Sequence, residues 1–286
     1  MRKLLYIACM WVAMIPWLVS CANEEAPMEK VQVTFTAKIP SEADSRSGES
    51  FGKGAHVTEL HCAIYEQGQN DRYTFVHSDV VRRSGDGFSY SPYLSKGKTY
   101  KIAFWAMASD AYIVSSDLTD VQIPTMICND PTKEAFAGVS KPVEVDASYG
   151  APIGVELKRP FALLNFATTM SSAQKAQKEN MTAEVTITCD DGVAESYNVL
   201  TGEVTKSENT FYTFSSAAIL GTECVNDHVT YIRLASCYVM PVVENMTIQA
   251  QIVVRKGAEE IGNLTTEPNI PLTVNYSTNL FGKMLE

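Results

Sequence analysis

The regular alternation of apolar and polar residues constrains this chain more than any other feature of its sequence. Val31, Val33 and Phe35 are separated by Gln32 and Thr34. Because successive side chains of a strand point to opposite faces of a sheet, this spacing predicts a strand with one buried face. Strand-forming runs recur at residues 60–65, 72–77, 99–107, 185–189, 231–239 and 246–254. Helical character is confined to the short polar segment 171–179, so the chain is predicted to be all-β.

Turn-forming residues between these runs favour β-sandwiches. Residues 84–87 and 190–192 combine serine, aspartate and glycine, which are typical of turns. Strands punctuated at such intervals are typical of a sandwich. The pattern breaks at residues 149–152, and at roughly 100 to 200 residues per domain the length of the chain implies two domains. We therefore predict an N-terminal β-sandwich over residues 31–157 and a C-terminal β-sandwich over residues 158–286.

Residues 1–20 have the pattern of a secretory signal peptide. Two basic residues precede an uncharged run at residues 4–19, which is shorter than the roughly 20 residues that a transmembrane helix needs. Residues 18–21, Leu-Val-Ser-Cys, resemble the lipobox of bacterial lipoproteins. The resemblance implies cleavage before Cys21, lipidation of its sulfur with fatty acids such as palmitate, and a lipid-anchored tether over residues 21–30. An ordinary signal peptide followed by an incidental cysteine is the alternative.

The charge of the chain limits the partners that it can have. Its 33 acidic and 23 basic residues give a formal net charge of −10. An acidic protein does not suit nucleic acid or anionic lipid as a partner. Glu24 and Glu25 follow the lipobox, and a similar acidic patch accompanies export to the outer face of the outer membrane in lipoproteins of some Gram-negative anaerobes. A solvated polar tether is the alternative interpretation of these two acids.

The residue types that carry catalysis or bind metals lack the spacing that such chemistry requires. No partner at metal-ligand spacing is found for the four histidines, His56, His61, His77 and His228. The acidic pairs at residues 190–191 and 259–260 are adjacent in sequence and point in different directions, whereas paired hydrolase carboxylates face each other. Arg159 is interpreted as a partner in a strand-edge ion pair and Trp105 as a core residue. We therefore expect no enzyme, no metal site and no cofactor.

Five cysteines remain beyond the predicted signal peptide and Cys21, namely Cys62, Cys128, Cys189, Cys224 and Cys237. No two of them have the close spacing of a zinc knuckle or a thioredoxin-type motif. Cys62 alternates with apolar neighbours, as does Cys189, so both are predicted to be buried as small apolar side chains. One disulfide is compatible with the sequence, for example Cys224 to Cys237, and the pairing stays open.

An ordered series of segments resembles the fimbrillin-like lipoproteins of Gram-negative anaerobes, which are type V pilus subunits, and their uncharacterised relatives. The most specific match is residues 156–166, Glu-Leu-Lys-Arg-Pro-Phe-Ala-Leu-Leu-Asn-Phe, where the second domain of that family begins. Weaker matches follow the family order at residues 33–37 with 45–47, 60–65, 104–106, 134–138, 197–202 and 275–282. The order of the whole set makes the resemblance specific.

The resemblance implies two tandem transthyretin-like β-sandwiches. In some members of that family an arginine-specific protease removes the first strand, and a neighbouring subunit donates a strand to the exposed groove. Arg46 lies in the polar segment 41–54, which is predicted to be a loop, and would be the site of such proteolytic maturation. In cells that lack the protease, the first strand and the lipid on Cys21 would be retained.

These features predict a surface-exposed lipoprotein that is lipid-anchored in the cell outer membrane. It would act as a structural or adhesive subunit of a fimbria-like filament, as stalk, tip or anchor. Its partners would be the outer membrane through the lipid, and pilus subunits or copies of itself through donor-strand exchange. The alternative is a stand-alone surface lipoprotein that binds glycan or host protein.

Overall fold

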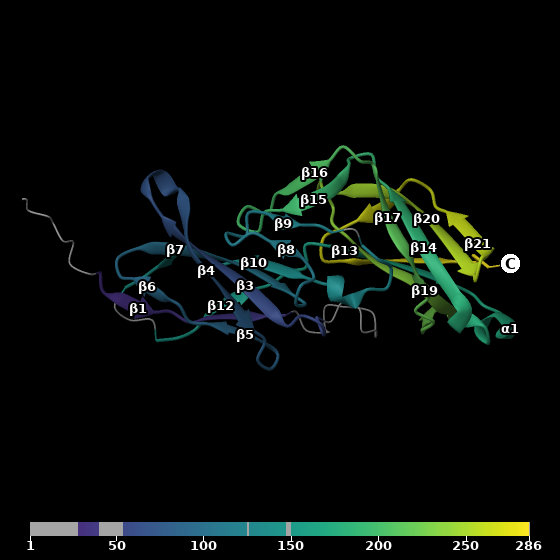
Figure 1. Cartoon of the computed structure of the whole chain (residues 1–286), viewed down its shortest axis with the longest axis horizontal. Coiled ribbons are helices and arrows are strands. Elements are labelled where there is room, and N and C mark those ends of the chain that lie inside the picture. The colour runs from purple at the N-terminus through teal and green to yellow at the C-terminus, as the bar shows by residue number, and fades with distance from the viewer. Residues whose placement is uncertain (1–27, 40–53, 125, 147–149, 286) are drawn as a thin grey trace, which may run out of the picture.

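A computed structural model of the protein describes residues 28–39, 54–124, 126–146 and 150–285. In this part of the chain, 23 strands outweigh one four-residue α-helix, α1 (Ser172–Lys175), and three short 3-10 turns. The predicted all-β class is therefore confirmed. Figure 1 shows an elongated molecule, with the N-terminal half in purple to teal at one end and the C-terminal half in green to yellow at the other. No helix in the described ranges is long and apolar enough to span a bilayer.

Two sheets pack against each other in the N-terminal half. The larger, antiparallel sheet has the order β10–β7–β3–β4, formed by Phe136–Val139, Thr99–Met107, Glu59–Gln67 and Tyr73–Arg82, and β11 (Val143–Glu144) also pairs with β7. The smaller sheet has the order β12–β2–β5, formed by Ile153–Glu156, Phe35–Lys38 and Gly87–Tyr90. At the margin, β1 (Lys30–Gln32) pairs with β6 (Tyr93–Ser95). The core between the two sheets includes Phe35, Leu60, Ile102 and Phe104.

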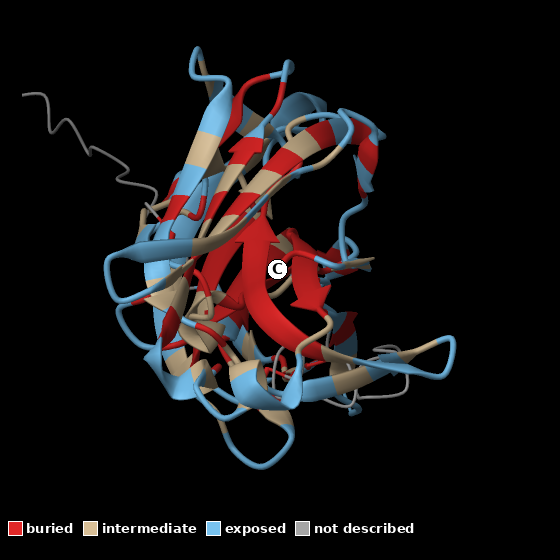
Figure 2. Cartoon of the chain, turned by 90° about the vertical axis from the view of Figure 1, so that its right-hand side faces the viewer, coloured by how far each residue is buried: buried red, intermediate tan, exposed pale blue. Residues whose placement is uncertain are grey.

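The C-terminal half repeats this arrangement with longer strands. One sheet has the order β17–β14–β20–β21, formed by Phe211–Ala218, Met181–Thr188, Met246–Lys256 and Glu259–Thr265, and β22 (Ile270–Leu272) also pairs with β20. The other has the order β18–β19–β13–β23, formed by Glu223–Asn226, Val229–Val239, Ala162–Thr168 and Ser277–Gly282. Figure 2 looks along the long axis from this end and shows the buried residues on the inner strands.

A further sheet joins the two halves. Its order is β16–β15–β9–β8, formed by Val204–Ser207, Val193–Tyr197, Val121–Gln122 and Ile113–Val114. β8 and β9 precede residue 157 in the chain, yet they pair with strands that follow it. Against this sheet, to which Tyr197 belongs, the Trp105 ring lies 5.4 to 6.4 Å from the rings of Tyr112, Phe161 and Tyr197. One apolar core therefore continues from Ala63 on β3 to Tyr238 on β19.

The chain changes sheets close to the predicted domain boundary. β12 ends at Glu156 in the N-terminal half, and β13 begins at Ala162 in the C-terminal half. Because the joining sheet and its core extend across this point, a division into two independent domains at residues 157 and 158 stays a prediction.

Two predicted elements differ in detail from those observed. The first strand is interrupted at Val33, whose N–H donates to the Pro92 carbonyl (3.0 Å) instead of to a ladder partner, so β1 and β2 belong to different sheets. Val33, Phe35 and Ala37 nevertheless share a buried face, as the alternation predicted. The predicted helical segment contains α1, whose Ser171 and Gln174 form a reciprocal capping box.

Candidate functional site

The two residues with a predicted role in maturation lie outside the described residues. Cys21 and Arg46 fall in the ranges 1–27 and 40–53, so lipidation and cleavage stay predictions. The elements on either side of Arg46 are described, and they determine what a cut there would release. Those elements form the candidate functional site.

The strand before Arg46 is an inner strand of the N-terminal sandwich. β2 lies between β12, to which it is parallel, and β5, to which it is antiparallel. Phe35 is opposite Ile153 on one side and Tyr90 on the other, and its ring lies 6.1 Å from that of Phe104 in the facing sheet. Val33, Phe35 and Ala37 are at most 1% exposed. Loss of β2 would therefore divide its sheet and open the core.

The residues that flank the segment 40–53 lie in contact with each other. Gly54 has a positive φ of 62°, and a Cβ placed on it would stand 2.5 Å from Cγ2 of Ile39. Glycine is required here for two reasons. Residues with a side chain rarely adopt this positive φ, and Ile39 already fills the space that a Cβ would need. The Gly54 N–H donates to Oε2 of Glu134 (2.7 Å). The chain thus leaves and re-enters the sandwich at one place.

Glu134 connects this place to the start of the C-terminal half through a buried ion pair. Its Oε1 accepts hydrogen bonds from Nη2 (2.5 Å) and Nε (3.1 Å) of Arg159. The two side chains are 2% and 8% exposed, and the guanidinium carbon lies 5.3 Å from the centre of the Phe136 ring. Arg159 is therefore in an ion pair, as the sequence indicated, but the pair is buried rather than at a strand edge. The pair joins the segment before β10 to the segment between β12 and β13.

The C-terminal strand completes its own sandwich. β23 runs parallel to β13, with Phe166 opposite Leu280. Beyond it, the Met284 N–H donates to Oγ1 of Thr168 (2.9 Å), and Met284 and Leu285 are only 5% and 3% exposed. The last described residues therefore belong to the core of this chain.

A separate surface lies along β4, which sequence reasoning did not identify. β4 is the outer strand of its sheet and, within the described residues, is laddered only to β3. It exposes Phe75, Val76 and Val80 by 38, 53 and 56%. A long outer strand with exposed apolar side chains can accept another chain. The alternation of apolar and polar residues does not reveal this surface. No residue of β4 is buried, so the strand has no apolar face that the sequence pattern could indicate.

A cleft of about 380 Å³ lies beside β4 and is lined by His61, Cys62, Ser78, Asp79, Val80, Val114, Ser115, Ser116 and Leu118. Nε2 of His61 is buried, has no hydrogen-bond partner among the described residues, and lies 3.8 Å from Oε2 of Glu59. Burial lowers the pKa of His61, and the charge of Glu59 partly opposes this. The cleft thus combines polar groups with apolar walls. We refer to the cleft and the exposed residues of β4 together as the β4 surface.

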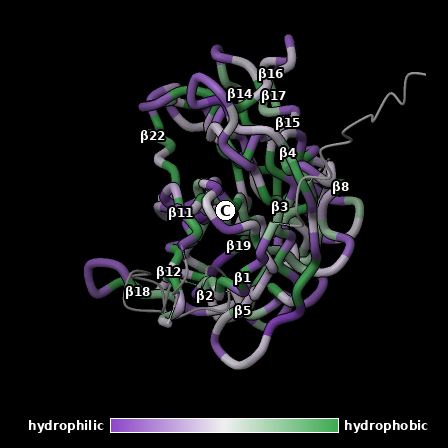
Figure 3. Tube along the Cα trace, turned by 90° about the vertical axis from the view of Figure 1, so that its left-hand side faces the viewer, coloured by the Kyte–Doolittle hydropathy of each residue, from purple (hydrophilic) through white to green (hydrophobic). Residues whose placement is uncertain are grey.

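The remaining predicted residues are structural. Trp105 is fully buried, and Cys62 and Cys189 are 1% exposed on the predicted core faces, so both interpretations are confirmed. Cys224 lies on the β18–β19 hairpin, which projects from the side of the molecule (Figure 3). The sulfur next to Cys237 belongs to Cys128, not to Cys224. The residues that the structure describes contain no cluster of three or more His, Cys, Asp or Glu side chains that could hold a metal ion.

Comparisons with known proteins agree with this fold. The profile of a family described as "Family of unknown function (DUF6562)" matches residues 24–286. A candidate cell adhesion protein from Bacteroides uniformis superposes with a TM-score of 0.52 at 9% identity, over 89% of this chain and 94% of that one. A candidate polysaccharide binding protein (DUF1812) from Bacteroides thetaiotaomicron gives 0.51 at 12% identity, over 89% and 92%.

The fimbrial anchor protein Mfa2 from Porphyromonas gingivalis gives a lower TM-score of 0.46 at 14% identity, over 88% of this chain and 91% of that one. No curated protein matches the chain. At such identities, the two TM-scores above 0.5 show a shared fold.

Proposed function

The chain belongs to the family of unknown function DUF6562, and from this membership and its fold we propose that it is a non-enzymatic, cell-surface subunit of a fimbria-like filament. Its role is structural or adhesive, as stalk, tip or anchor. The observation that carries the proposal is the position of β2, an inner strand that directly precedes the segment with Arg46. The shared fold of a candidate cell adhesion protein supports a role at the surface.

Strand exchange is the proposed means of assembly. A cut at Arg46 would release β1 and β2 together and leave a groove between β12 and β5. The floor of that groove is the core face that now contacts Phe35, including Phe104. At about 25 cal/mol per Å2 of apolar surface, exposing a few hundred Å2 costs on the order of several kcal/mol. A strand from another subunit would recover this free energy by entering the groove.

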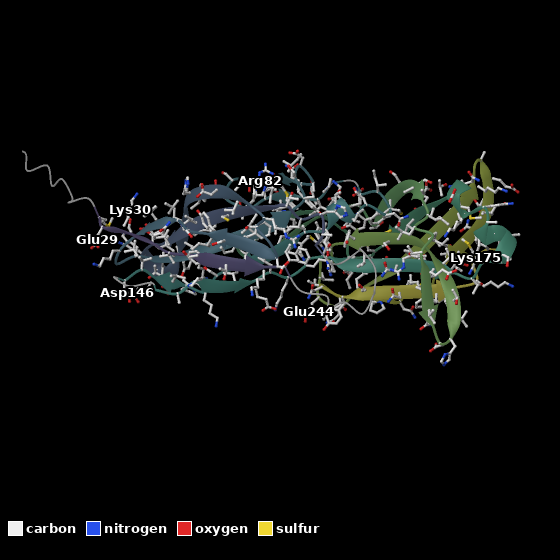
Figure 4. The ribbon with its side chains drawn as sticks, turned by 90° about the horizontal axis from the view of Figure 1, so that it is seen from below. Glu29, Lys30, Arg82, Asp146, Lys175 and Glu244 are labelled. Atoms are coloured by element: carbon white, nitrogen blue, oxygen red, sulfur yellow. The ribbon has the colours of Figure 1, made fainter. Side chains whose placement is uncertain are left out.

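We propose that the protein is attached to the outer membrane through lipid on Cys21. β1 starts at Lys30, and Figure 4 places Glu29 and Lys30 at one end of the long axis, with Lys175 near the other. A tether over residues 21–30 would therefore join the membrane to one end of the molecule. The end that carries α1 and β21 would then point away from the cell.

For the uncleaved form, we propose an anchor or tip role. The chain keeps its first strand paired in this state, and β23 with Met284 and Leu285 fills its own core. Neither end of the described chain is thus offered to a neighbour. Cleavage would convert the same molecule into a stalk subunit with an empty groove.

Mass spectrometry of the mature N-terminus from purified outer membranes tests this proposal. We expect an acylated Cys21 and no new N-terminus at Ser47 in cells without an arginine-specific surface protease. Adding such a protease should produce Ser47 and detergent-resistant ladders on a gel, and Arg46→Ala should prevent both. Cys21→Ala should move the protein to a soluble fraction. A cleaved protein that stays monomeric would contradict assembly by strand exchange.

The β4 surface favours a second function, the binding of glycan by a stand-alone surface lipoprotein. The cleft presents Ser78 and Asp79 for hydrogen bonds to hydroxyl groups, and Phe75 is exposed on the same strand. The protein of the same fold from Bacteroides thetaiotaomicron is described as a candidate polysaccharide binding protein.

Calorimetric titration of the uncleaved protein with bacterial and host polysaccharides distinguishes the two functions. Binding that Ser78→Ala weakens, with Ser89→Ala on β5 as the control, would favour the glycan binder. Absence of heat with every polysaccharide, together with ladders after cleavage, would favour the filament subunit.

A further inference from the structure

Two buried cysteines from distant parts of the sequence lie in contact. Sγ of Cys128 is 3.6 Å from Sγ of Cys237, and each residue is 1% exposed. Cys128 lies between β9 and the 3-10 turn at Pro131–Lys133, whereas Cys237 is near the C-terminal end of β19, opposite Leu164 of β13. The pair therefore connects the segment that carries Glu134 to the β18–β19–β13–β23 sheet of the C-terminal half.

The backbone beside the two sulfurs is held in place by four hydrogen bonds. The Asn129 N–H donates to the Ser236 carbonyl (3.0 Å), and the Ser236 N–H donates to Oδ1 of Asn129 (2.8 Å). Nδ2 of Asn129 donates to the carbonyls of Ala218 (2.8 Å) and Leu234 (3.1 Å). The chain neighbours of both cysteines are thus fixed side by side, and the sulfurs would have to move from 3.6 Å to about 2.05 Å apart to bond.

The other three cysteines are placed differently. Cys62 belongs to the core of the N-terminal sandwich, where its thiol donates to the Leu60 carbonyl. Cys189 directly follows β14, and Cys224 is partly exposed on β18. Cys128 and Cys237 differ from these three because their sulfurs lie against each other. The five cysteines thus comprise one contacting pair, Cys128 and Cys237, and three thiols outside it.

We propose that Cys128 and Cys237 form a disulfide when the chain folds outside the cytoplasm. The oxidant is the disulfide of an exported dithiol oxidase. Both cysteine thiols lose their protons and together two electrons, the new S–S bond forms, and the disulfide of the oxidase is reduced to two thiols. The inference rests on the proposed export, because disulfides persist in oxidising compartments.

Burial determines when this bond forms and how it resists reduction. In the folded dithiol, burial and the neighbouring Cys128 raise the pKa of Cys237 well above its ordinary value, so little thiolate is present to attack an oxidant. The bond therefore forms before the segment packs onto β19. Once packed, it is shielded from external reductants.

Disulfide mapping of the full-length protein from outer membranes tests the inference. The protein is denatured in iodoacetamide without reduction and digested with trypsin. Arg72, Lys133, Lys206 and Arg233 separate the five cysteines, so that each lies on its own tryptic peptide. We expect one linked pair, residues 102–133 with residues 234–255, and alkylated Cys62, Cys189 and Cys224. Alkylation of both Cys128 and Cys237, or a link from Cys237 to Cys224, would overturn the inference.

Matched variants and reductants sharpen the result. Cys189→Ser should leave the link intact, whereas Cys128→Ser should leave Cys237 alkylated in the same experiment. Native protein should keep the link in dithiothreitol that removes it fully after denaturation, and rapid loss from the native protein would contradict the buried placement. Because the link is read from peptides, the outcome does not depend on filament assembly or on glycan binding.

Discussion

At the scale of single residues, Glu134 joins two separate parts of the chain. Its two carboxylate oxygens receive the Gly54 N–H and the Arg159 guanidinium, and the side chain is 2% exposed. Removing one partner of a buried ion pair leaves the other charge in a medium that solvates it poorly. The stability of the junction therefore depends on this carboxylate.

We expect Glu134→Gln to lower the free energy of unfolding by about 3 to 5 kcal/mol, because the Arg159 charge stays buried without its counter-charge. Glu156→Gln is the control. Glu156 also pairs with a basic residue, Lys158 at 3.7 Å, but both side chains are more than 60% exposed, so a change within about 1 kcal/mol is expected. Urea unfolding followed by tryptophan fluorescence measures both, and equal effects would show that burial is not the cause.

The pH dependence of stability should depend on His61. Its pKa is lowered in the folded protein by burial, so the unfolded chain binds the proton more readily. The contribution of neutral His61 to the stability of the folded protein is fully present above the unfolded pKa of about 6.5. It is lost as pH falls through the folded pKa. The melting temperature should therefore decrease between pH 7.5 and pH 5, and less steeply in His61→Gln. His228→Asn, in an exposed turn, is the control variant.

At the scale of elements, β2 is the strand on which the N-terminal sandwich depends. Phe35→Ala should cost about 3 to 5 kcal/mol, because it leaves a cavity against Phe104. Thr36→Ala, which changes the partly exposed opposite face of the same strand, should cost much less. Chemical denaturation compares the two, and similar costs would mean that β2 is not a core strand in solution.

The sequence predicted these strands where a single face is buried over several residues. On β7, which was predicted as a strand over residues 99–107, Ile102, Phe104 and Ala106 share one buried face, but the opposite face, with Trp105, is buried as well. When both faces of a strand are apolar, the sequence no longer alternates, and the pattern does not show which residues share a face. β8 and β9 are two residues long, too short to establish any period.

Non-local partners could not be predicted from sequence. Arg159 was expected in an ion pair, yet nothing local identifies Glu134 as its partner, because the two meet only when β12 and β13 are in place. The contact of Cys128 with Cys237 spans 109 residues in the same way. The β4 surface was missed for a different reason, because every residue of β4 is exposed or partly exposed and the strand therefore shows no buried face.

At the scale of the whole molecule, removal of the first two strands should change the oligomeric state. A chain of residues 47–286 should self-associate, because the groove between β12 and β5 exposes apolar core. A synthetic peptide of residues 28–40 should restore a monomer, and the same peptide with Phe35→Asp should not. Light scattering follows both reactions, and residues 22–286 serve as the intact control. A monomeric 47–286 chain with unchanged stability would sink the proposed strand exchange.

The core that continues from Ala63 to Tyr238 has a mechanical consequence. Bending the long axis at the junction would pull Trp105 away from Phe161 and Tyr197 and open a gap in packed apolar side chains. Such a gap costs free energy because packing contacts are lost. We therefore expect the junction to be rigid and not to act as a hinge. If the protein is held at a membrane by one end, a sideways force on its far end would then be transmitted to the attachment point. The molecule would keep its full length under that force.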